Sequence, residues 1–509
     1  MIYIDPPYNT GNDFVYNDDF ARTAAEEDLE AGNVDELGLR YRKNTDTNGK
    51  FHSDWCSMIY SRLLVARSLL TEDGVIFISI DDNEVRNLRN ICDEVFGEGN
   101  YISTLVWERA YSPKNDAKYI SNSHDYIVMY AKSIDNFTIG RLPRTEEANA
   151  RYSNPDNDPR GIWKPSDMSV KTYNAECDYP ITTPSGRTVE PPAGRCWRLS
   201  AKAFAERLQD NRIWFGADGN SVPSIKRFLS ELKYEGMAPT SILFYKEVGH
   251  SQEGAQEVVA LFGDKGVFDG PKPVRLMQRL ITLANLNDDS IVLDFFSGSS
   301  TTAQAVMQFN AEDGGKRKFI MVQLPEETPE DSEARKAGYK TIPEIAKERI
   351  RRAGKKIKEE NPLTTQDLDI GFRVFRLDES NYLEVKKSPK EYDQDMLGLF
   401  VDNIKADRTD LDLLFGSMLA WGVHLDMPMT TEEVDGCTVY TVNEGDLVAC
   451  FSEPITDKVI QTMADKMPLR ILFRDSCFTD DAQKINIYEQ FKQLLDWADD
   501  EAFKNIKVI

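Results

Sequence analysis

The sequence predicts an α/β fold built on a mostly parallel sheet. Three largely apolar runs indicate buried strands, at Ile2–Ile4, Val75–Ile80 and Ser290–Phe296. Polar residues follow each run directly, and helical patterns follow the second and third. Buried strands that alternate with helices are typical of parallel sheets, and ligands of such folds bind at the carboxyl ends of the strands.

Length and charge limit the architecture and the partners. A chain of 509 residues requires two or three domains. Its formal net charge of −24 argues against a protein that binds nucleic acid over its whole surface. Local basic patches remain compatible with that charge, because phosphate contact depends on how the cations are distributed.

Cysteine usage and hydropathy indicate the cellular compartment. The seven cysteines form no Cys-x-x-Cys pair and the four histidines are scattered, so we expect reduced thiols and no metal site. No apolar run reaches membrane-spanning length, and the N-terminus has no basic stretch followed by a signal-peptide core. We therefore expect a cytoplasmic protein without membrane contact.

The first part of the chain adds a polar insertion, two helices and two strands. Residues 18–54 are polar, with one short helix expected at Ala21–Glu30, and fit a functional loop or a solvated flap equally well. Apolar residues recur at helical spacing from Trp55 to Leu70, and a second helix is expected at Asn83–Phe96. An antiparallel pair that finishes one edge of the sheet is expected at Tyr101–Trp107 and Tyr126–Tyr130.

Residues 133–265 differ in composition from the α/β segments around them. Aromatic residues are interleaved with cations, a mixture that suits nucleic-acid contact; the cations are Arg160, Lys164, Lys171, Arg187, Arg195, Arg198, Arg212, Lys226 and Arg227. Composition alone favours the other interpretation, an irregular β-rich domain with an aromatic core.

The α/β pattern resumes after residue 265. Helices are expected at Pro273–Leu286 and from Ala303 onward, and a strand at Lys318–Leu324. A further helix at 342–360 combines an apolar stripe with a basic face, which fits a solvated surface or a phosphate contact; the face comprises Lys347, Arg349, Arg351, Arg352, Lys355, Lys356 and Lys358.

Asn361-Pro362 marks a domain boundary. Residues 363–509 are expected to form a separate acidic α+β domain, with a strand at Phe372–Leu377 and a helix at Tyr488–Phe503. This part contains no catalytic constellation, so we expect a role in structure or assembly.

The first candidate site is Asp5-Pro6-Pro7-Tyr8, directly after the first strand. The prolines cannot continue a hydrogen-bonded ladder, so the strand ends there. A carboxylate, a stiff turn and an aromatic ring therefore lie at the edge of the sheet where ligands bind. By itself the tetrapeptide also fits an ordinary turn at a strand end.

The second candidate site is the run from Asp294 to Thr302, where a strand leads into small polar residues and a helix. Such a turn lets a ligand approach the backbone closely. No lysine follows the turn, which excludes a P-loop. Glu326 lies 32 positions after Asp294 (326 − 294), at the end of the next strand, where an acid can accept hydrogen bonds from ribose hydroxyls.

Together these motifs resemble a known family. Asp5–Tyr8 resembles the catalytic motif of amino-group DNA methyltransferases, and Asp294–Gly298 resembles their S-adenosylmethionine motif. Phe268–Pro273 resembles a further cofactor motif of the same family. The order of motifs matches the circularly permuted β group, and the extended motifs resemble the modification (Mod) subunit of type III restriction-modification systems, over roughly residues 1–360.

The resemblance implies a Rossmann-like methyltransferase domain, circularly permuted, with an inserted target-recognition domain and a C-terminal α+β domain. The implied domains are a catalytic half at 1–132, a target-recognition region at 133–265, a cofactor half at 266–362 and an assembly domain at 363–509. The implied partners are double-stranded DNA, a second copy in a homodimer, and a restriction (Res) subunit with helicase and nuclease activity.

The implied reaction is methylation of adenine N6 with S-adenosylmethionine as cofactor, and the catalytic residues are Asp5, Pro6, Pro7 and Tyr8. Asp5 and the Pro6 carbonyl would each accept one amino N–H, aiming the nitrogen lone pair at the methyl group. Tyr8 would stack on a base that has left the duplex. The implied cofactor-binding residues are Lys272, Asp294, Phe296, Gly298, Ser299, Thr301 and Glu326, with Phe296 facing the sulfonium.

Two features separate this chain from the family pattern. Met1 begins inside the catalytic strand, so we expect a truncated start and a sheet that lacks a flanking helix. Ser300 stands where many relatives have glycine. Two alternatives remain open: a catalytically inactive DNA-recognition or scaffold subunit, and a cytosine-N4 methyltransferase, although cytosine-N4 enzymes more often carry serine in place of Asp5.

Overall fold

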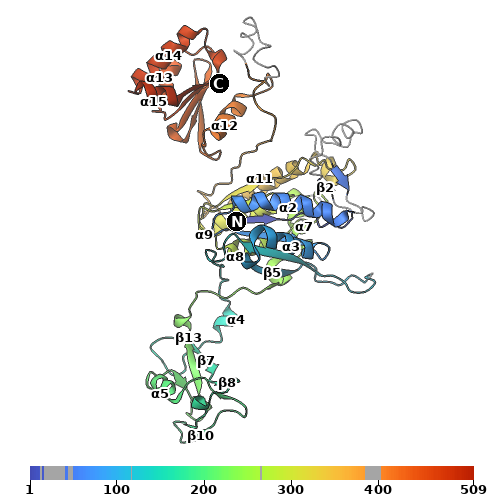
Figure 1. Cartoon of the computed structure of the whole chain (residues 1–509), viewed down its shortest axis with the longest axis vertical. Helices are drawn as coiled ribbons and strands as arrows, with labels where there is room; N and C mark the ends of the chain where they lie inside the picture. The colour runs from blue at the N-terminus through green and yellow to red at the C-terminus, as the bar shows by residue number, and fades with distance from the viewer. Residues whose placement is uncertain (12–13, 17–40, 44–49, 116, 264–265, 384–402) are drawn as a thin grey trace. The chain divides into compact units, whose positions relative to one another are not determined.

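The computed structural model describes residues 1–11, 14–16, 41–43, 50–115, 117–263, 266–383 and 403–509. The helix expected at Ala21–Glu30 lies outside these residues. Two compact units are present, Met1–Ile370 and Gly371–Ile509 (Figure 1). Within the described residues, no helix has the length and apolar character needed to span a bilayer.

The first unit is built on a sheet that contains, among the described residues, seven strands in the order β14-β5-β6-β4-β1-β15-β16. Four strands run parallel: β1 (Ile2–Ile4), β4 (Val75–Ile80), β15 (Ile291–Asp294) and β16 (Lys318–Met321). Next to β4 lie β6 (His124–Ala131) and β5 (Tyr101–Glu108), which pair antiparallel. The predicted α/β fold is therefore confirmed.

The edge of the sheet differs from the prediction. The antiparallel pair is confirmed, but β14 (Ile242–Leu243) adds outside β5 and runs parallel to it, so β5 is not the last strand. β14 is only two residues long and lies far along the chain from β5. Its sequence therefore contains no periodic signal that could assign it to this sheet.

Helices cover both faces of the sheet (Figure 1). On one face lie α2 (Phe51–Leu69) and α3 (Val85–Phe96), packed on Ile2, Ile4 and the same-facing residues of β4. On the other face lie α8 (Val274–Ala284) and α9 (Thr301–Asp313), packed on Tyr3 and Phe77. Alternate residues of each strand thus fill two separate cores, because successive side chains point to opposite faces.

The outer layer comes from segments far apart in sequence. It contains α6 (Tyr245–Val248), α7 (Ser251–Phe262), α10 (Glu333–Lys336) and α11 (Ile342–Glu360), with α11 against α9 and α7, and α6 against α8. Because β14, α6 and α7 pack with the sheet, residues 242–262 belong structurally to the sheet domain, whereas the predicted recognition range ran to 265. A two-stranded hairpin, β2 (Phe14–Tyr16) with β3 (Tyr41–Lys43), lies near α2.

Between β6 and β14 the chain forms an irregular β-rich region, closed by the antiparallel bridge between Leu142 and Met237. Its elements are α4 (Glu146–Asn149), β7 (Trp163–Asp167), β8 (Ser169–Val170), β9 (Ile181–Thr182), β10 (Thr188–Val189), β11 (Cys196–Trp197), α5 (Ala201–Gln209), β12 (Ile213–Trp214) and β13 (Ser224–Phe228). Buried aromatic residues form its core, among them Trp197 and Phe215. The β-rich interpretation is confirmed.

Seven of the nine cations interleaved with aromatic residues in this region fall into two groups. Lys226 is buried between Asp156 and Asp158, and Arg160 and Arg212 pair with Asp210. These three stabilise the fold and are not free to bind phosphate. A second group is exposed to solvent, namely Lys171, Arg187, Arg198 and Arg227.

The second unit, Gly371–Ile509, has its own five-stranded sheet. The order is β17 (Met429–Val434), β18 (Cys437–Val442), β19 (Leu447–Cys450), β20 (Ile471–Phe473) and β21 (Ile506–Val508), antiparallel up to β19 and parallel beyond it. The helices are α12 (Asp410–Ala420), α13 (Asp457–Asp465), α14 (Asp481–Leu494) and α15 (Asp499–Asn505). The unit begins at Gly371, whereas the predicted boundary was at 362/363.

Two predictions for the second unit are wrong. Residues 372–377 form no strand; their Arg373 guanidinium instead donates to the backbone carbonyls of Leu425 and Met427. The helix expected at Tyr488–Phe503 is divided into α14 and α15, because Asp496 takes a left-handed conformation (φ 53°) that a helix cannot continue through.

Candidate active site

Asp5 follows the last residue of β1, at the carboxyl edge of the sheet. The Tyr8 hydroxyl donates to its Oδ1 at 2.9 Å, and the Lys272 ammonium contacts its Oδ2. Burial, and then the Asp5 charge, raise the pKa of Tyr8 well above its ordinary value, so the phenol remains a donor. Both Asp5 oxygens keep further lone pairs for a substrate N–H.

The two prolines hold the turn after Asp5. The Pro7 carbonyl accepts a hydrogen bond of 2.7 Å from the indole Nε1 of the fully buried Trp55. Within the residues that the structure describes, no group donates to the Pro6 carbonyl. One carbonyl of the turn is thus fixed by the protein and the other stays available as an acceptor.

Glu84, a residue that the motif search missed, supports the same turn. Its side chain is completely buried and accepts hydrogen bonds from Asn9 Nδ2 at 2.6 Å and Asn87 Nδ2 at 2.7 Å, and His52 lies against it. Asn9 has a left-handed backbone (φ 59°), so its side-chain bond helps to hold a strained position next to Tyr8. The sequence did offer one signal for Glu84: it is an acid that follows Asp81 and Asp82 just past the end of β4, where site residues are expected.

Asp294 ends β15 and is 2% exposed. Its Oδ2 accepts from the Thr302 hydroxyl at 2.6 Å, and its Oδ1 accepts from the Phe296 N–H at 3.2 Å. Burial raises the pKa of Asp294 to about 7, and the two hydrogen bonds only partly oppose this rise. The carboxyl therefore holds the turn between β15 and α9 together and changes its charge near neutral pH.

The turn itself requires small residues. Gly298 has φ +48°, and a Cβ at this position would lie 3.0 Å from Cζ of Phe268. Its N–H donates to Gln323 Oε1 at 2.8 Å. Ser300 also has a left-handed backbone (φ 60°) directly before α9, the conformation that a glycine would adopt without strain.

Arg349 was predicted on the basic face of α11, and this placement is wrong. Its side chain is fully buried beneath the turn, where one guanidinium nitrogen donates to Ser299 Oγ at 2.8 Å and Thr301 Oγ1 at 2.7 Å, and Nε donates to Gln304 at 3.0 Å. Burial lowers its pKa to about 10, while Glu257 raises it. The signal was present in the sequence, because position 349 lies four residues after Ile345 on the apolar stripe.

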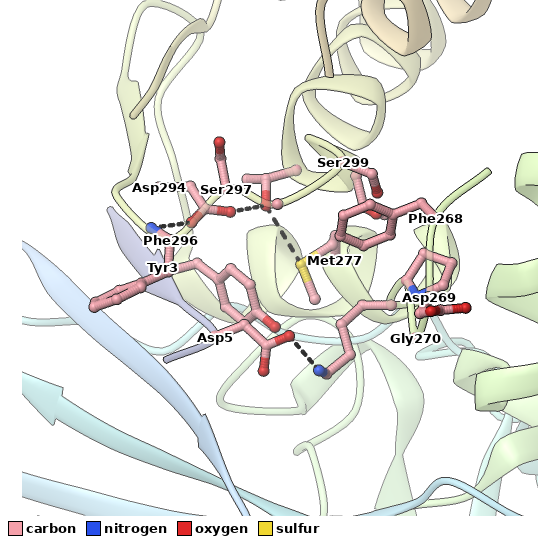
Figure 2. Close-up of a pocket in the computed structure, with 15 residues that line it drawn as sticks. Tyr3, Asp5, Phe268, Asp269, Gly270, Met277, Asp294, Phe296, Ser297 and Ser299 are labelled. Atoms are coloured by element: carbon pink, nitrogen blue, oxygen red, sulfur yellow. Dashed lines mark hydrogen bonds and ion pairs between the residues drawn. The ribbon is translucent and has the colours of Figure 1, made fainter. Parts of the chain in front are cut away.

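The two strand ends open into one cavity of about 520 Å³ of atom-free space, part of it open to solvent. Figure 2 shows Asp5 and Asp294 on one side of it and Phe268 on the other. The cavity brings together seven of the predicted site residues: Asp5, Lys272, Asp294, Phe296, Gly298, Ser299 and Thr301. Its lining also includes further residues of the predicted motifs, namely Phe268, Asp269, Gly270, Pro271, Ser297 and Thr302, and two residues outside them, Tyr3 and Met277.

Four predicted site residues do not line this cavity. Pro6, Pro7 and Tyr8 lie in the turn behind Asp5, and Glu326 contacts Gln323 Nε2 at 3.4 Å. The role of Glu326 as a ribose acceptor stays a prediction. Lys272, predicted as a cofactor residue, lines the cavity and pairs with the Asp5 carboxylate, and its contact with a cofactor stays a prediction.

The cavity has the features of a site for an organic cation with polar substituents. Carboxyl groups line it at Asp5, Asp269 and Asp294, and the Lys272 ammonium, also part of the lining, pairs with Asp5. Phe296 borders the cavity too, with its ring packed toward the core beneath α2 and α3. Ser297 Oγ is buried and has no hydrogen-bond partner among the described residues, which leaves it available to a ligand.

One known protein family matches most of the first unit, Met1–Ile370. The family N6_N4_Mtase, described as DNA methylase, matches residues 1–334. The chain belongs to this family. The DNA methylase family thus covers the sheet, both motifs and the β-rich region between them.

Relatives within the DNA methylase family include subunits of restriction-modification enzymes. The chain is 40% identical over 381 residues to the type III restriction-modification enzyme StyLTI Mod subunit of Salmonella typhimurium, an alignment covering 74% of this chain and 56% of that one. It is 36% identical to the EcoPI Mod subunit of Escherichia phage P1, over 74% of this chain and 61% of that one. The resemblance to type III Mod subunits is therefore confirmed, and the chain spans just over half the length of these two relatives.

A third relative is matched over more of its own length. The type II methyltransferase M.KpnI of Klebsiella pneumoniae is 30% identical, over 68% of this chain and 80% of that one. Among solved structures, the PvuII DNA methyltransferase (cytosine-N4-specific) aligns with 69% of this chain and 85% of its own, at 13% identity and a TM-score of 0.30. That score is too low to compare the arrangement of the two folds.

Proposed function

We propose that this chain is a site-specific DNA adenine-N6 methyltransferase, the modification subunit of a type III restriction-modification system, acting in the cytoplasm. The observation that carries the proposal is the shared cavity: Asp5, at the end of β1, and the turn from Ser297 to Thr302 face one space. Membership of the DNA methylase family and the similarity to Mod subunits support the same reaction.

Asp5 and the Pro6 carbonyl carry the chemistry in this proposal. An adenine amino group is a weak nucleophile because its lone pair is delocalised into the ring. When Asp5 and Pro6 each accept one N–H, the nitrogen becomes more tetrahedral and its lone pair points at the methyl group. The Trp55 and Glu84 contacts hold these acceptors in place before the base arrives, so little reorganisation is needed.

We propose S-adenosylmethionine as the cofactor, which supplies a methyl group activated by a positively charged sulfur. The residues that would hold it are Asp294, Phe296, Gly298, Ser299 and Thr301, with Ser297 as a further contact. The tight backbone at Gly298 allows close approach of the cofactor. Lys272 balances the charge of Asp5 in the same cavity.

Double-stranded DNA is the proposed substrate, and the β-rich region between β6 and β14 is the proposed reader of its sequence. The exposed group of cations there, Lys171, Arg187, Arg198 and Arg227, is available for phosphate contact. By the similarity to Mod subunits we further propose a homodimer that pairs with a Res helicase-nuclease subunit, with residues 371–509 contributing to assembly.

The test combines cofactor binding with methylation mapping. Titration calorimetry with S-adenosylmethionine should show saturable binding to the purified chain. Methylation-sensitive sequencing of DNA from cells that express the chain should show N6-methyladenine at one short sequence. Asp5→Ala should abolish this mark and leave duplex binding, measured by fluorescence anisotropy, within about twofold of the wild type, because no predicted phosphate contact is removed.

The outcomes separate the alternatives. Absence of S-adenosylmethionine binding would indicate a recognition or scaffold subunit and overturn the enzymatic assignment. A mark on cytosine N4 would overturn the assignment to adenine. Retained methylation in Asp5→Ala would refute the role given to Asp5.

A further inference from the structure

The loop between β5 and β6 can be followed in Figure 1. In its described residues, 109–115 and 117–123, apolar side chains are exposed to solvent. Tyr119 and Ile120 are each 84% exposed, so neither contributes to a core. Scattered exposed apolar residues are ordinary, but two adjacent ones in a long connecting loop leave a combined apolar surface in water, at a cost in free energy. The position and charge of the loop indicate which partner would cover that surface.

The base of the loop is firmly held. The Ala110 N–H donates to the Ser123 carbonyl at 3.1 Å, closing the two arms, and Arg109 Nε pairs with Asp125 Oδ1 at 2.8 Å. The Tyr111 ring lies 5.2 Å from His250, centroid to centroid. Contacts at both ends of the loop, residues 109–111 and 123, thus fix its base, whereas Tyr119 and Ile120 at its tip belong to no core.

The base of the loop lies beside the candidate active site. Ile80, the last residue of β4, pairs with Tyr126 of β6, and β4 runs parallel to β1, so the loop leaves the sheet at the edge where Asp5 lies. Asp82, just past β4, accepts from Asn122 Nδ2 at 2.9 Å and from the Tyr126 hydroxyl at 2.8 Å. The start of β6 and the end of β4 are therefore tied together at the catalytic edge.

Electrostatic interactions of Asp125 also place the base of the loop near Asp5. Burial raises the pKa of Asp125 to about 6, and the charges of Arg109 and Lys272 oppose that rise, whereas Asp5 adds to it. Asp125, at the foot of the loop, is thus within electrostatic range of the Asp5–Lys272 pair.

The charge of the tip favours one kind of partner. Lys114 and Lys118 are exposed, and the Lys118 ammonium lies 5.0 Å from the Tyr119 ring centroid. With Asp116 between them in the sequence, segment 114–120 has a formal net charge of +1 (+2 − 1). In a chain with a net charge of −24, a tip that combines lysines with a tyrosine and an isoleucine matches phosphates that surround stacked bases.

We propose that Tyr119 and Ile120 form a wedge that enters duplex DNA beside the target base and occupies the space left when that base moves into the active site. Lys114 and Lys118 contact the flanking phosphates. A target base inside the stack is out of reach of Asp5, and apolar side chains inserted between base steps are a known means of opening a duplex. This inference rests on the proposed function.

The test compares two double variants on two DNA substrates, once sequencing has located the methylated site. The wedge variant is Tyr119→Ser with Ile120→Ser. The matched control is Val65→Ser with Leu69→Ser, two exposed apolar residues near the end of α2. This helix leads into the amino-terminal end of β4, at the end of the strands opposite Asp5. The substrates are a fully paired duplex and the same duplex with an abasic site opposite the target adenine, where no partner base holds the target.

We expect the wedge variant to lose about tenfold or more in kcat/KM on the paired duplex, since tenfold corresponds to only part of the cost of unstacking a base. On the abasic duplex the loss should shrink to about twofold, because the base leaves that stack without help. 2-Aminopurine at the target position should brighten with the wild type and the control, and less with the wedge variant. S-adenosylmethionine affinity should remain unchanged in all three proteins.

Three results would overturn the wedge. They are an unchanged rate on the paired duplex, an equal loss on both duplexes, and loss of self-association by light scattering with normal 2-aminopurine brightening. The second would make the loop a general DNA grip, and the third would make it an interface between protein chains. A wild type that neither binds cofactor nor methylates any duplex overturns the proposed function, and the wedge with it.

Discussion

Two neighbouring parallel strands, β1 and β15, end in the same way and produce different sites. Each ends next to an aspartate that lines the same cavity, Asp5 and Asp294. The Asp5 side chain is 26% exposed and meets a tyrosine hydroxyl and a lysine, whereas Asp294 is buried against its own turn. One carboxylate is presented to a ligand, and the other mainly holds the backbone.

The residues directly after each aspartate explain the difference. Pro6 and Pro7 have no N–H to offer, so Asp5 receives none from its own turn and faces outward. The turn after Asp294 supplies the Phe296 N–H and the Thr302 hydroxyl, which draw that carboxyl inward. Whether a strand-end acid turns inward thus depends on the backbone N–H groups that its own turn supplies.

The largest expected effect separates the two acids by activity. Asp5→Asn should lower kcat by about 10³-fold with little change in S-adenosylmethionine affinity, because one acceptor of the amino protons becomes a donor. Asp294→Asn should instead weaken S-adenosylmethionine binding about tenfold, because the turn loses its strongest acceptor. Steady-state kinetics and titration calorimetry measure both. Similar changes in the two variants would contradict the division of roles.

The next effect concerns the support beneath the second turn. Arg349→Met should lower the free energy of unfolding by about 3 kcal/mol, because Ser299, Thr301 and Glu257 lose a buried cationic partner. Arg351→Met on the same helix removes a mostly exposed arginine, 57% exposed, and should cost less than about 0.5 kcal/mol. Urea unfolding of both variants provides the comparison. A cost below about 1 kcal/mol for Arg349→Met would show that the turn does not depend on it.

The pH dependence of stability should reveal the contribution of the buried Asp294 carboxyl group. Its pKa is raised in the folded state to about 7 from an ordinary value of 3.8, so folding favours the protonated form. That contribution is complete below pH 4 and is lost as the pH rises toward 7, amounting to about 2 kcal/mol between pH 5 and pH 7. Asp294→Asn should remove this loss, whereas Thr302→Val, which keeps the carboxyl, should retain it. Parallel curves for wild type and Asp294→Asn would contradict the assignment.

The smallest effect tests the rigidity of the first turn. Trp55→Phe removes the hydrogen bond to the Pro7 carbonyl and should cost about 1 kcal/mol of stability and about threefold in kcat. Trp197→Phe removes an equivalent buried indole bond, to the Tyr179 carbonyl at 2.8 Å, and should cost similar stability with kcat unchanged. Equal kcat values in the two variants would show that the Pro7 contact does not position Asp5.

The sequence by itself determined the elements with strong periodicity and the local chemistry of both motifs. Val75–Ile80 is a strand at the predicted residues, and the helix predicted at 342–360 is present at those residues. The two motifs predicted one site, because parallel strands present their carboxyl ends at a common edge.

Only the tertiary structure decided which partners each side chain meets. Arg349 lies under the turn from Ser297 to Thr302, Lys272 contacts Asp5, and β14 joins the sheet from beyond the β-rich region. Each of these contacts joins segments that are far apart in the chain, so no local spacing encodes it. The contrast between Asp5 and Asp294 has both origins. The donors that follow each acid are local in the sequence, whereas the burial of each carboxyl group results from packing.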